Sequence, residues 1–337
     1  MPTLVDPSLG TNPDQYNALL TSTLGAYRKT LVDNFSDATP FTWWLSQNER
    51  KKYQRGGTHI DIPLMYAGVD VQPFSGFQKL NTEPAEGIAP ATALWKKYQV
   101  PIVISKDHET ENMGEAQIIS LVEAKVRQAE ISFREELNYD LINNGLTGTS
   151  GDSSAVPDNL RVTGLTDMLQ DATNARVYEG IGGSSYSWWK NTFDTSVNFT
   201  NATSDGIEKM RSVYLTCSRG QDRPDLILTS QDGYENYDAL LVDQKRFVNT
   251  MAADAGFESL MYRGSTILFD RDVPSDFMFF LNSTYLELTV HPDVDMHHTP
   301  FREAENQWAR FSRIMWKGQL CCTNRKRQGL LNGVTST

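Results

Sequence analysis

The sequence has little of what marks several large classes of protein. Its 337 residues include only 3 cysteines, two of them adjacent at Cys321 and Cys322, which does not indicate a disulfide framework and fits a reducing cytoplasm. The first ten residues, MPTLVDPSLG, show no basic region followed by an apolar core, so we expect no signal peptide. No apolar run approaches the roughly 18 residues that a membrane-crossing helix needs. We therefore expect a soluble protein with no membrane partner.

An excess of positive charge is also missing. The chain carries 31 Lys and Arg against 42 Asp and Glu, a formal net charge of −11, which disfavours general binding to nucleic acid. Hydrophobic residues make up 39% and charged residues 22%, ordinary values for a folded domain. The length allows two domains or one elaborated domain.

No stretch of the sequence assembles an active site. We find no phosphate loop, and the glycines at residues 180–183 neither follow a predicted strand nor precede a helix, as a dinucleotide site requires. Residues 148–154, GTSGDSS, resemble a serine-protease nucleophile region only faintly, because the following glycine and an aligned His and Asp are missing. Cys321 and Cys322 alternate on a predicted strand, so one should face a core, and we expect no catalytic thiol.

The densest group of metal-binding residue types is HPDVDMHH, at residues 291–298. A metal site needs three or four such side chains to converge, and a polar loop between two strands has the same composition. We therefore predict no catalytic, cofactor-binding or metal-binding residues and no enzyme. A metal-dependent enzyme remains a less favoured alternative, built on His291, Asp293, Asp295, His297 and His298.

One basic triplet stands out on this acidic chain, at Arg325, Lys326 and Arg327. It could contact nucleic acid. We favour pairing with carboxylates of a neighbouring subunit, because the chain as a whole repels phosphate.

The most regular feature present is a long helix predicted over residues 114–144. Apolar residues recur there at steps of four and three, the pattern of one amphipathic helix. They are Ile118, Val122, Val126, Ala129, Phe133, Leu137 and Leu141. At about 1.5 Å per residue the helix would span roughly 45 Å.

A second unusual feature is an extended arm. Residues 59–64 and 98–104 alternate with a period of two and predict strands. About 30 residues rich in Gly, Pro and small polar groups separate them, longer than an ordinary loop. Because an isolated two-stranded ribbon is at best marginally stable, we predict an arm that lies on another copy of the protein.

The N-terminal region and four tryptophans also suggest contacts between copies. Residues 1–57 do not form an independent domain, although residues 16–35 predict a helix. Large aromatics gather in PFTWWL at residues 40–45, and exposed they would form a patch that monomers rarely tolerate. Trp43, Trp44, Trp188 and Trp189 are candidate interface anchors, with at least half of them expected in the core.

From about residue 203 onward, helices and strands alternate. We predict a helix at 204–215 with Ile207, Met210, Tyr214 and Leu215 on one side, and a second helix at 231–242. The predicted strands are residues 224–229, 257–262, 266–269, 277–281, 285–290, 309–316 and 320–323.

The order of these elements resembles the major capsid proteins of tailed bacteriophages, which have the Hong Kong 97-type fold. The resemblance covers nearly the whole chain and rests on several motifs. They are FREELNYDLINNG, GLTDMLQ leading to YEGIGGSSYSWWKN, RPDLILTSQDGYENYDALL, GFESLMYRGSTILFDRDVPSDFMFFLNSTYLEL and QLCCTNRKRQGLLNGV. Residues 256–288, with Asp270, Pro274 and Asn282, carry the most specific part.

The resemblance implies an α+β fold with a defined division of the chain. In this division residues 1–57 form an N-terminal arm, 58–100 an extended β-hairpin loop, and 101–164 a peripheral domain with its spine helix at 114–144. Residues 165–285 are mainly an axial α/β domain, and residues 286–337 give C-terminal strands shared between the two domains.

The resemblance also implies a function. Many copies would form hexamers and pentamers of an icosahedral head shell, enclosing double-stranded DNA without sequence-specific binding. The shell would be assembled in the bacterial host cytoplasm and kept in the virion. A separate scaffolding protein, a portal protein and decoration proteins are the implied partners, and no self-crosslinking through Lys79 is expected. An encapsulin-type compartment around protein cargo is the main alternative.

Overall fold

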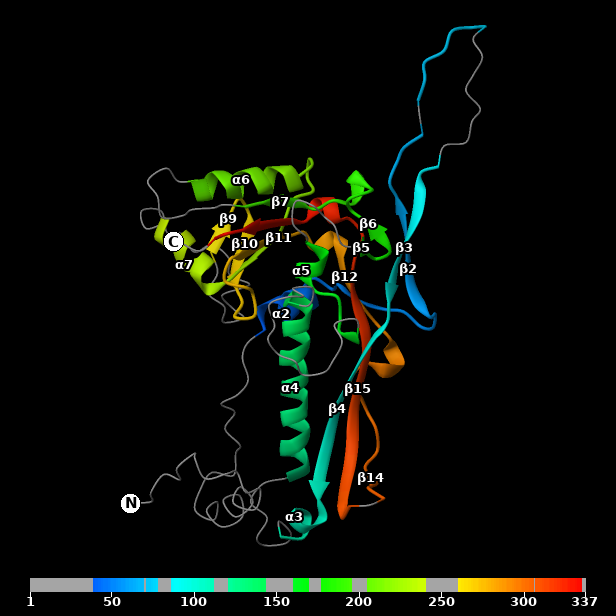
Figure 1. Ribbon diagram of the computed structural model, residues 1–337, viewed down its shortest axis with the longest axis vertical. Coiled ribbons are helices and arrows are strands. Elements are labelled where there is room, and N and C mark those ends of the chain that lie inside the picture. Colours follow the sequence, from blue (N-terminus) through cyan, green and yellow to red (C-terminus); the bar gives the residue numbers. More distant parts are fainter. Residues whose placement is uncertain are drawn as a thin grey trace. The chain divides into compact units, whose positions relative to one another are not determined.

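Figure 1 shows the computed structural model of the chain. The structure describes residues 39–69, 71–77, 86–111, 121–143, 160–169, 177–195, 205–240, 260–305 and 307–334. The predicted helix at 16–35, most of the predicted N-terminal arm, residues 148–154 and Lys79 lie outside the described residues. The chain divides into two compact units. Of the described residues, the small unit holds 98–111, 121–135, 296–305 and 307–316, and the large unit holds the rest.

The small unit packs a helix on a sheet. Its elements are α3 (Lys106–Glu111), β13 (His297–His298), β14 (Arg302–Glu303) and parts of α4 (Leu121–Asn143), β4 (Lys96–Ser105) and β15 (Ala309–Cys322). Strands β13, β14 and β4 all pair with β15. Ile102 and Ile104 of β4 and Ile314 of β15 bury themselves against Ala129 of α4, because alternate residues of a strand share one face.

The long helix follows the predicted stripe over most of its described length. Ala129, Phe133, Leu137 and Leu141 are all buried. Val122 is 41% exposed, so the stripe does not extend to the first described turn as predicted. Near its C-terminus the helix also buries polar side chains, Asn138 and Asp140.

The main sheet of the large unit runs in the order β7-β16-β11-β8-β10-β9. Its strands are Thr192–Asp194, Gly329–Asn332, Phe277–Leu281, Leu226–Thr229, Ser265–Phe269 and Leu260–Tyr262 in that order. Helices α6 (Asp205–Cys217) and α7 (Gln231–Leu240) share a core with Ile227, Ile267 and Phe280 of this sheet. The predicted α/β block is confirmed.

The buried face of α6 differs from the prediction. The side chains that enter the core are Met210, Val213, Tyr214 and Cys217. Ile207 is 36% and Leu215 53% exposed. The predicted face is therefore confirmed at Met210 and Tyr214 and wrong at Ile207 and Leu215, and Val213 and Cys217 complete the buried face at helical spacing.

In the large unit, β1 (Lys51–Tyr53) runs parallel to β12 (Leu286–Val290), and β12 pairs antiparallel with β15. The two strands predicted at 309–316 and 320–323 form one continuous strand, β15. Gly318 does not interrupt it, because it pairs with Val290. The Nζ atoms of Lys51 and Lys52 lie 2.6 and 2.5 Å from carboxylate oxygens of Asp295 and Glu287.

Short elements complete the large unit. They are α2 (Pro40–Gln47), α5 (Leu165–Met168), β5 (Val177–Tyr178), β6 (Ile181–Gly182), η4 (Ser187–Trp189), η5 (Ser283–Tyr285), η6 (Pro292–Val294) and η7 (Arg325–Arg327). The glycine-rich stretch around residues 180–183 belongs to the tight hairpin β5–β6. In the described part of the chain no helix is both long and apolar enough to cross a membrane.

Candidate assembly surface

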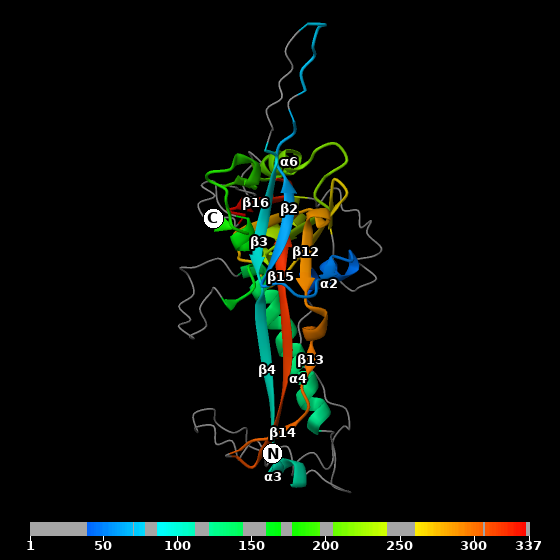
Figure 2. The ribbon, with the colours of Figure 1, turned by 90° about the vertical axis from the view of Figure 1, so that its right-hand side faces the viewer.

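Strands β2 (His59–Met65) and β3 (Ile88–Leu94) form a two-stranded antiparallel hairpin in the large unit. They lie side by side in Figure 2 and pair with each other from His59–Leu94 to Met65–Ile88. The sequence predicted residues 98–104 as the second strand of the arm, and this was wrong, because those residues belong to β4, which pairs with β15.

The prediction that the arm lies on another copy is wrong for its inner face, which packs on its own unit. Ile60 is 2%, Ala91 0% and Ala93 3% exposed, and Ile60 and Ala93 share a small core with Cys321 of β15. The residues that β3 contributes to this face are alanines, at positions 89, 91 and 93. Small side chains let the backbone of β3 lie close to what it covers.

In β3, the larger apolar side chains lie on the outer face, which also holds the polar pair Asp61 and Thr92. We call Pro63, Met65, Ile88, Pro90 and Leu94 the outer ladder, because the register pairs Pro63 with Pro90 and Met65 with Ile88 on this face. Met65 is 83%, Ile88 73% and Leu94 61% exposed. A strand that packs only on its own core turns its larger apolar side chains toward that core. Strand β3 does the opposite, because its inward residues are alanines and Ile88 and Leu94 point outward.

The hairpin continues into an apolar tip. Within residues 66–77, Val69 is 76%, Val71 89%, Phe74 67% and Phe77 107% exposed. This segment extends beyond the two strands (Figure 1). Monomeric soluble proteins rarely expose contiguous apolar patches of this kind unless they bind something.

Proline removes one hydrogen-bond donor from the free edge of β3. Thr92 N donates to Glu179 O (2.8 Å), so the N–H of this residue points away from β2. The N–H groups of residues two apart on a strand point in the same direction. Pro90 lies two residues before Thr92 and has no N–H, so it offers no donor at this edge. The surface left for recognition is therefore the outer ladder, not the strand edge.

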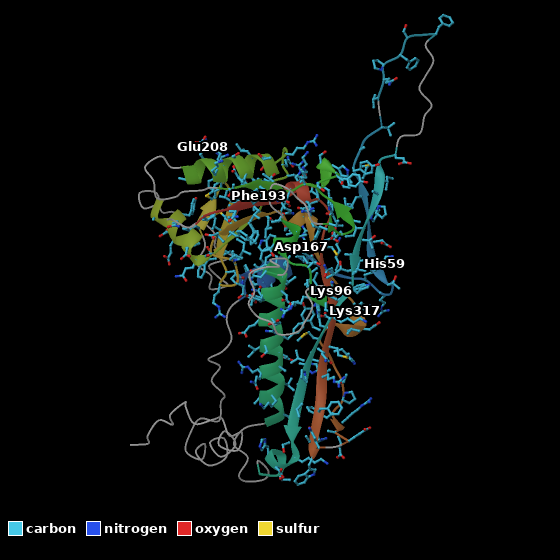
Figure 3. The ribbon with its side chains drawn as sticks, in the orientation of Figure 1. His59, Lys96, Asp167, Phe193, Glu208 and Lys317 are labelled. Carbon is cyan, nitrogen blue, oxygen red and sulfur yellow. The ribbon has the colours of Figure 1, made fainter. Side chains whose placement is uncertain are left out.

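Aromatic and polar contacts hold the root of the hairpin. The ring of Tyr66 stacks on Trp188 of η4, with centroids 5.0 Å apart. The Lys317 ammonium lies 4.7 Å from the ring centroid of Trp95, which follows β3. Figure 3 labels Lys317 on β15 together with His59 at the start of β2.

Glu179 joins the hairpin to β15. It sits between β5 and β6 with a φ of 50°, unusual for a residue other than glycine. Its main-chain oxygen accepts from Thr92, and its Oε1 accepts from Cys322 N (2.9 Å) at the end of β15. Burial raises the pKa of its carboxyl to about 8, against the opposing effects of this hydrogen bond and of Arg325. The side chain thus favours its neutral form near physiological pH.

The prediction that the basic triplet pairs with a neighbouring subunit is wrong for Arg325, which its own unit buries. Arg325 is fully buried, and its guanidinium donates to Met168 O (2.8 Å) and lies over the rings of Tyr178 and Trp189. Arg327 donates to Cys217 O (3.2 Å). Of the three, Lys326 alone is exposed. An arginine buried by a carbonyl and by aromatic faces from distant parts of the chain gives no local sequence signal.

The residues at 291–298 are divided among other contacts. His291 lies edge-on to Trp95, with ring centroids 6.0 Å apart, and Asp295 pairs with Lys51. His298 Nε2 lies 3.6 Å from Glu130 Oε1. Within the described residues, no group of three His, Cys, Asp or Glu side chains gathers as a metal site would require.

The two adjacent cysteines are both fully buried. Burial raises the pKa of each thiol above its ordinary value. Thiolate is the reactive form, so the environment of Cys321 and Cys322 favours an inert role.

Two of the four candidate tryptophan anchors are core residues. Trp44 is 7% and Trp189 1% exposed. Trp43 and Trp188 are half-buried. The prediction that at least half of them belong to the core is confirmed.

Solved structures with the same arrangement of elements exist. The chain aligns with a chain of the cyanophage A-1(L) capsid asymmetric unit at a TM-score of 0.67 and 18% identity, covering 94% of this chain and 98% of that one. The capsid of the native GTA particle gives a TM-score of 0.57 at 11% identity, covering 95% and 99%. The capsid of Myoviridae phage XM1 gives 0.55 at 8%, covering 92% and 97%. This is the tailed-phage capsid-protein fold. No protein-family model and no curated protein matches the sequence.

The expected Hong Kong 97-type fold is therefore confirmed. At these identities the residues are mostly different while nearly the whole length aligns.

The residues missed by sequence reasoning are those of β3. The sequence IAPATAL places alanine at every second position, which is a strict period of two. Pro90 and the low strand preference of alanine obscured it. The alternation of alanine with larger residues was the signal that marks this strand.

Proposed function

We propose that this chain is a major capsid protein, whose copies form the head shell of a tailed phage as hexamers and pentamers around double-stranded DNA. The capsid-protein fold over 94% of the chain supports a shell subunit. The observation that carries the proposal is the outer ladder, a set of large apolar side chains turned away from the protein's own core.

The outer ladder gives a physical reason for assembly. Removing apolar surface from water stabilises by about 25 cal/mol per Å², and the outer ladder and the tip keep that surface exposed in a single copy. A sister copy that covers them gains this free energy. Obligate assemblies bury roughly 2,000–5,000 Å² in such interfaces, and we infer that the extended loop at residues 58–100 contributes a large part of it.

The remaining roles follow from the same proposal. Residues 1–57 act as an arm on a neighbouring copy, residues 101–164 form the peripheral domain, 165–285 mainly the axial domain, and 286–337 strands shared by both. The shell is assembled in the bacterial host cytoplasm with a separate scaffolding protein and closed at a portal protein, and decoration proteins bind it from outside. The chain is structural, catalyses no reaction and encloses DNA without reading its sequence.

The test compares three forms of the full chain, each co-expressed with the scaffolding protein of the same phage. The first is the native chain, the second carries Met65→Ser and Ile88→Ser, and the third carries the matched apolar changes Met65→Leu and Ile88→Val. We expect closed particles from the native chain and the apolar control, seen by electron microscopy. The serine variant should stay as folded, unassembled subunits.

Two outcomes would overturn the proposal. One is a native chain that remains a compact monomer at high concentration with its scaffold. The other is a serine variant that assembles as well as the native chain. Particles that hold a protein cargo in place of DNA would favour the encapsulin-type alternative.

A further inference from the structure

Three arginines gather around one tyrosine of the large unit, at the turn between β9 and β10. Arg263 lies in that turn, and its guanidinium lies over the ring of Tyr262, 5.7 Å from the ring centroid. The Arg223 guanidinium lies against Gly264, because a Cβ atom added to this glycine would be 3.7 Å from Arg223 Nη2. Burial raises the pKa of Tyr262, and the charges of Arg263 and of Arg211, on α6, oppose this rise. We call Arg211, Arg223 and Arg263 the arginine cluster.

The positive charge of the arginine cluster is little balanced. All three side chains are exposed. Among the residues that the structure describes, no carboxylate forms an ion pair with Arg223 or Arg263. Arg211 Nη2 lies 3.7 Å from Glu208 Oε1, but both side chains are more than half exposed, and such pairs contribute little. The cluster is therefore a positive surface on a chain whose net charge is −11.

The backbone at Arg263 gives a second, independent observation. Tyr262 pairs with Ser265, so residues 263 and 264 form a two-residue turn, with φ angles of 50° and 91°. Positive φ at both positions is the pattern of a type I′ turn, whose first position favours Asn, Asp or Gly. An arginine in this conformation costs the fold free energy that asparagine would not. A strained residue of this kind indicates that its side chain has a function.

We propose that the arginine cluster binds the phosphate backbone of duplex DNA. This inference rests on the proposed function, in which the shell encloses DNA. A guanidinium presents paired N–H donors that match the oxygens of a phosphate, and the ring of Tyr262 holds the Arg263 side chain in place. Backbone contacts carry no sequence information, which agrees with enclosing DNA without reading it. A closed shell holds this polyanion at high concentration, which favours DNA over an acidic peptide as the occupant.

The test uses the unassembled full-length protein and a fluorescently labelled duplex of about 20 base pairs, followed by anisotropy between about 50 and 200 mM salt. We expect a Kd of about 10⁻⁴ M near physiological salt, at the weak end of non-specific binding. Three phosphate contacts predict a slope of log K against log salt of about −2.7. Arg223→Gln combined with Arg263→Gln should weaken binding at least tenfold at the lowest salt and leave a slope of about −0.9.

The matched control combines Arg55→Gln with Arg302→Gln, which remove the same charge at exposed sites outside the cluster. The slope should then stay at its native value. If this control loses as much affinity as the cluster variant, net charge alone explains the binding and the inference is overturned. A labelled oligoglutamate peptide that binds the native chain more tightly than the duplex does would also overturn it, in favour of an acidic peptide.

A second variant, Arg263→Asn, separates binding from folding. It supplies a residue that this turn favours and removes the cation, so the melting temperature should stay the same or rise while DNA binding weakens several-fold. A lower melting temperature with unchanged binding would show that Arg263 serves the fold alone, which overturns the inference.

Assembly with the scaffold is scored separately, by electron microscopy of the native chain. Closed particles from a chain whose unassembled form does not bind the duplex would overturn this inference and leave the proposed function standing. A bound duplex without particles would overturn the proposed function and leave the phosphate contacts of the arginine cluster standing.

Discussion

Glu179 should make the stability of the large unit fall as the pH rises. Its carboxyl is buried at the joint between the β2–β3 hairpin and β15, and burial raises its pKa from 4.5 to about 8. A group with a raised pKa holds its proton more tightly in the folded state than in the unfolded state. The contribution of Glu179 to the free energy of unfolding is therefore fully present below pH 4.5 and is lost as the pH rises toward 8.

The size of the effect follows from the two pKa values. Each unit of difference corresponds to about 1.4 kcal/mol, so between pH 4.5 and pH 8 the free energy of unfolding should fall by at most about 5 kcal/mol through this group. The other ionisable groups beside it change little in this range. Burial raises the pKa of Tyr178, Cys321 and Cys322 above their ordinary values, and Arg325 stays charged because its ordinary pKa exceeds 12.

The perturbation is Glu179→Gln, which keeps an acceptor for Cys322 N but cannot ionise. We expect this variant to match the native chain within about 1 kcal/mol at pH 5 and to exceed it in stability by several kcal/mol at pH 9. The measurement is urea unfolding of the unassembled protein from pH 5 to pH 9, followed by tryptophan fluorescence. Trp189 lies 6.4 Å from Tyr178, ring to ring, and reports on this joint.

The control is Glu208→Gln, on the exposed side of α6 (Figure 3), whose carboxylate is 69% exposed. It should leave the pH profile of the native chain unchanged. The reasoning is refuted if the difference in stability between Glu179→Gln and the native chain is the same at pH 5 and pH 9. A constant difference would mean that Glu179 ionises in the folded protein as it does in the unfolded chain.

Two further changes test the packing of the large unit by the same urea unfolding. Phe280→Ala empties a fully buried position of the main core and should lower the free energy of unfolding by about 3–5 kcal/mol. Phe269→Ser, at a site that is 40% exposed, should lower it much less. Equal losses of stability would contradict the assigned core. Arg161→Ala removes the guanidinium 2.7 Å from Asp140, whose side chain is 1% exposed, and should cost about 3–5 kcal/mol because it takes away one partner of a buried ion pair. Arg161→Lys should recover part of that loss, and a full loss with lysine would show that charge alone does not explain the pair.

The sequence predicts well the helices and strands whose local hydrophobic pattern matches their burial in the fold. The buried face of α4 from Ala129 to Leu141 follows the helical repeat, and β11, Phe277–Leu281, coincides with the prediction residue for residue. In these segments, burial by the rest of the fold agrees with the local pattern, so the pattern alone is sufficient.

The failures occur where a distant part of the chain decides the environment. Arg325 looked like a surface cation, yet Met168 and Trp189, more than 130 positions away in sequence, enclose it. The pairing of β2 was assigned to residues 98–104 because their aliphatic alternation is stronger than that of β3. Strand partners depend on contacts that no local window contains.

If copies bind through the outer ladder as proposed, the energetics favour a closed assembly over a simple pair. Burying Met65, Ile88 and Leu94 fully would stabilise one contact by at most roughly 5–9 kcal/mol, taking about 1.5–3 kcal/mol for each side chain. Association of two proteins costs about 4–15 kcal/mol in lost freedom, so a single hairpin contact is marginal. In a ring every copy gives one hairpin and receives another, and the last subunit gains two contacts for one loss of freedom. Under the proposed contact between copies, β3, with its large side chains outside, therefore favours closed rings over isolated dimers.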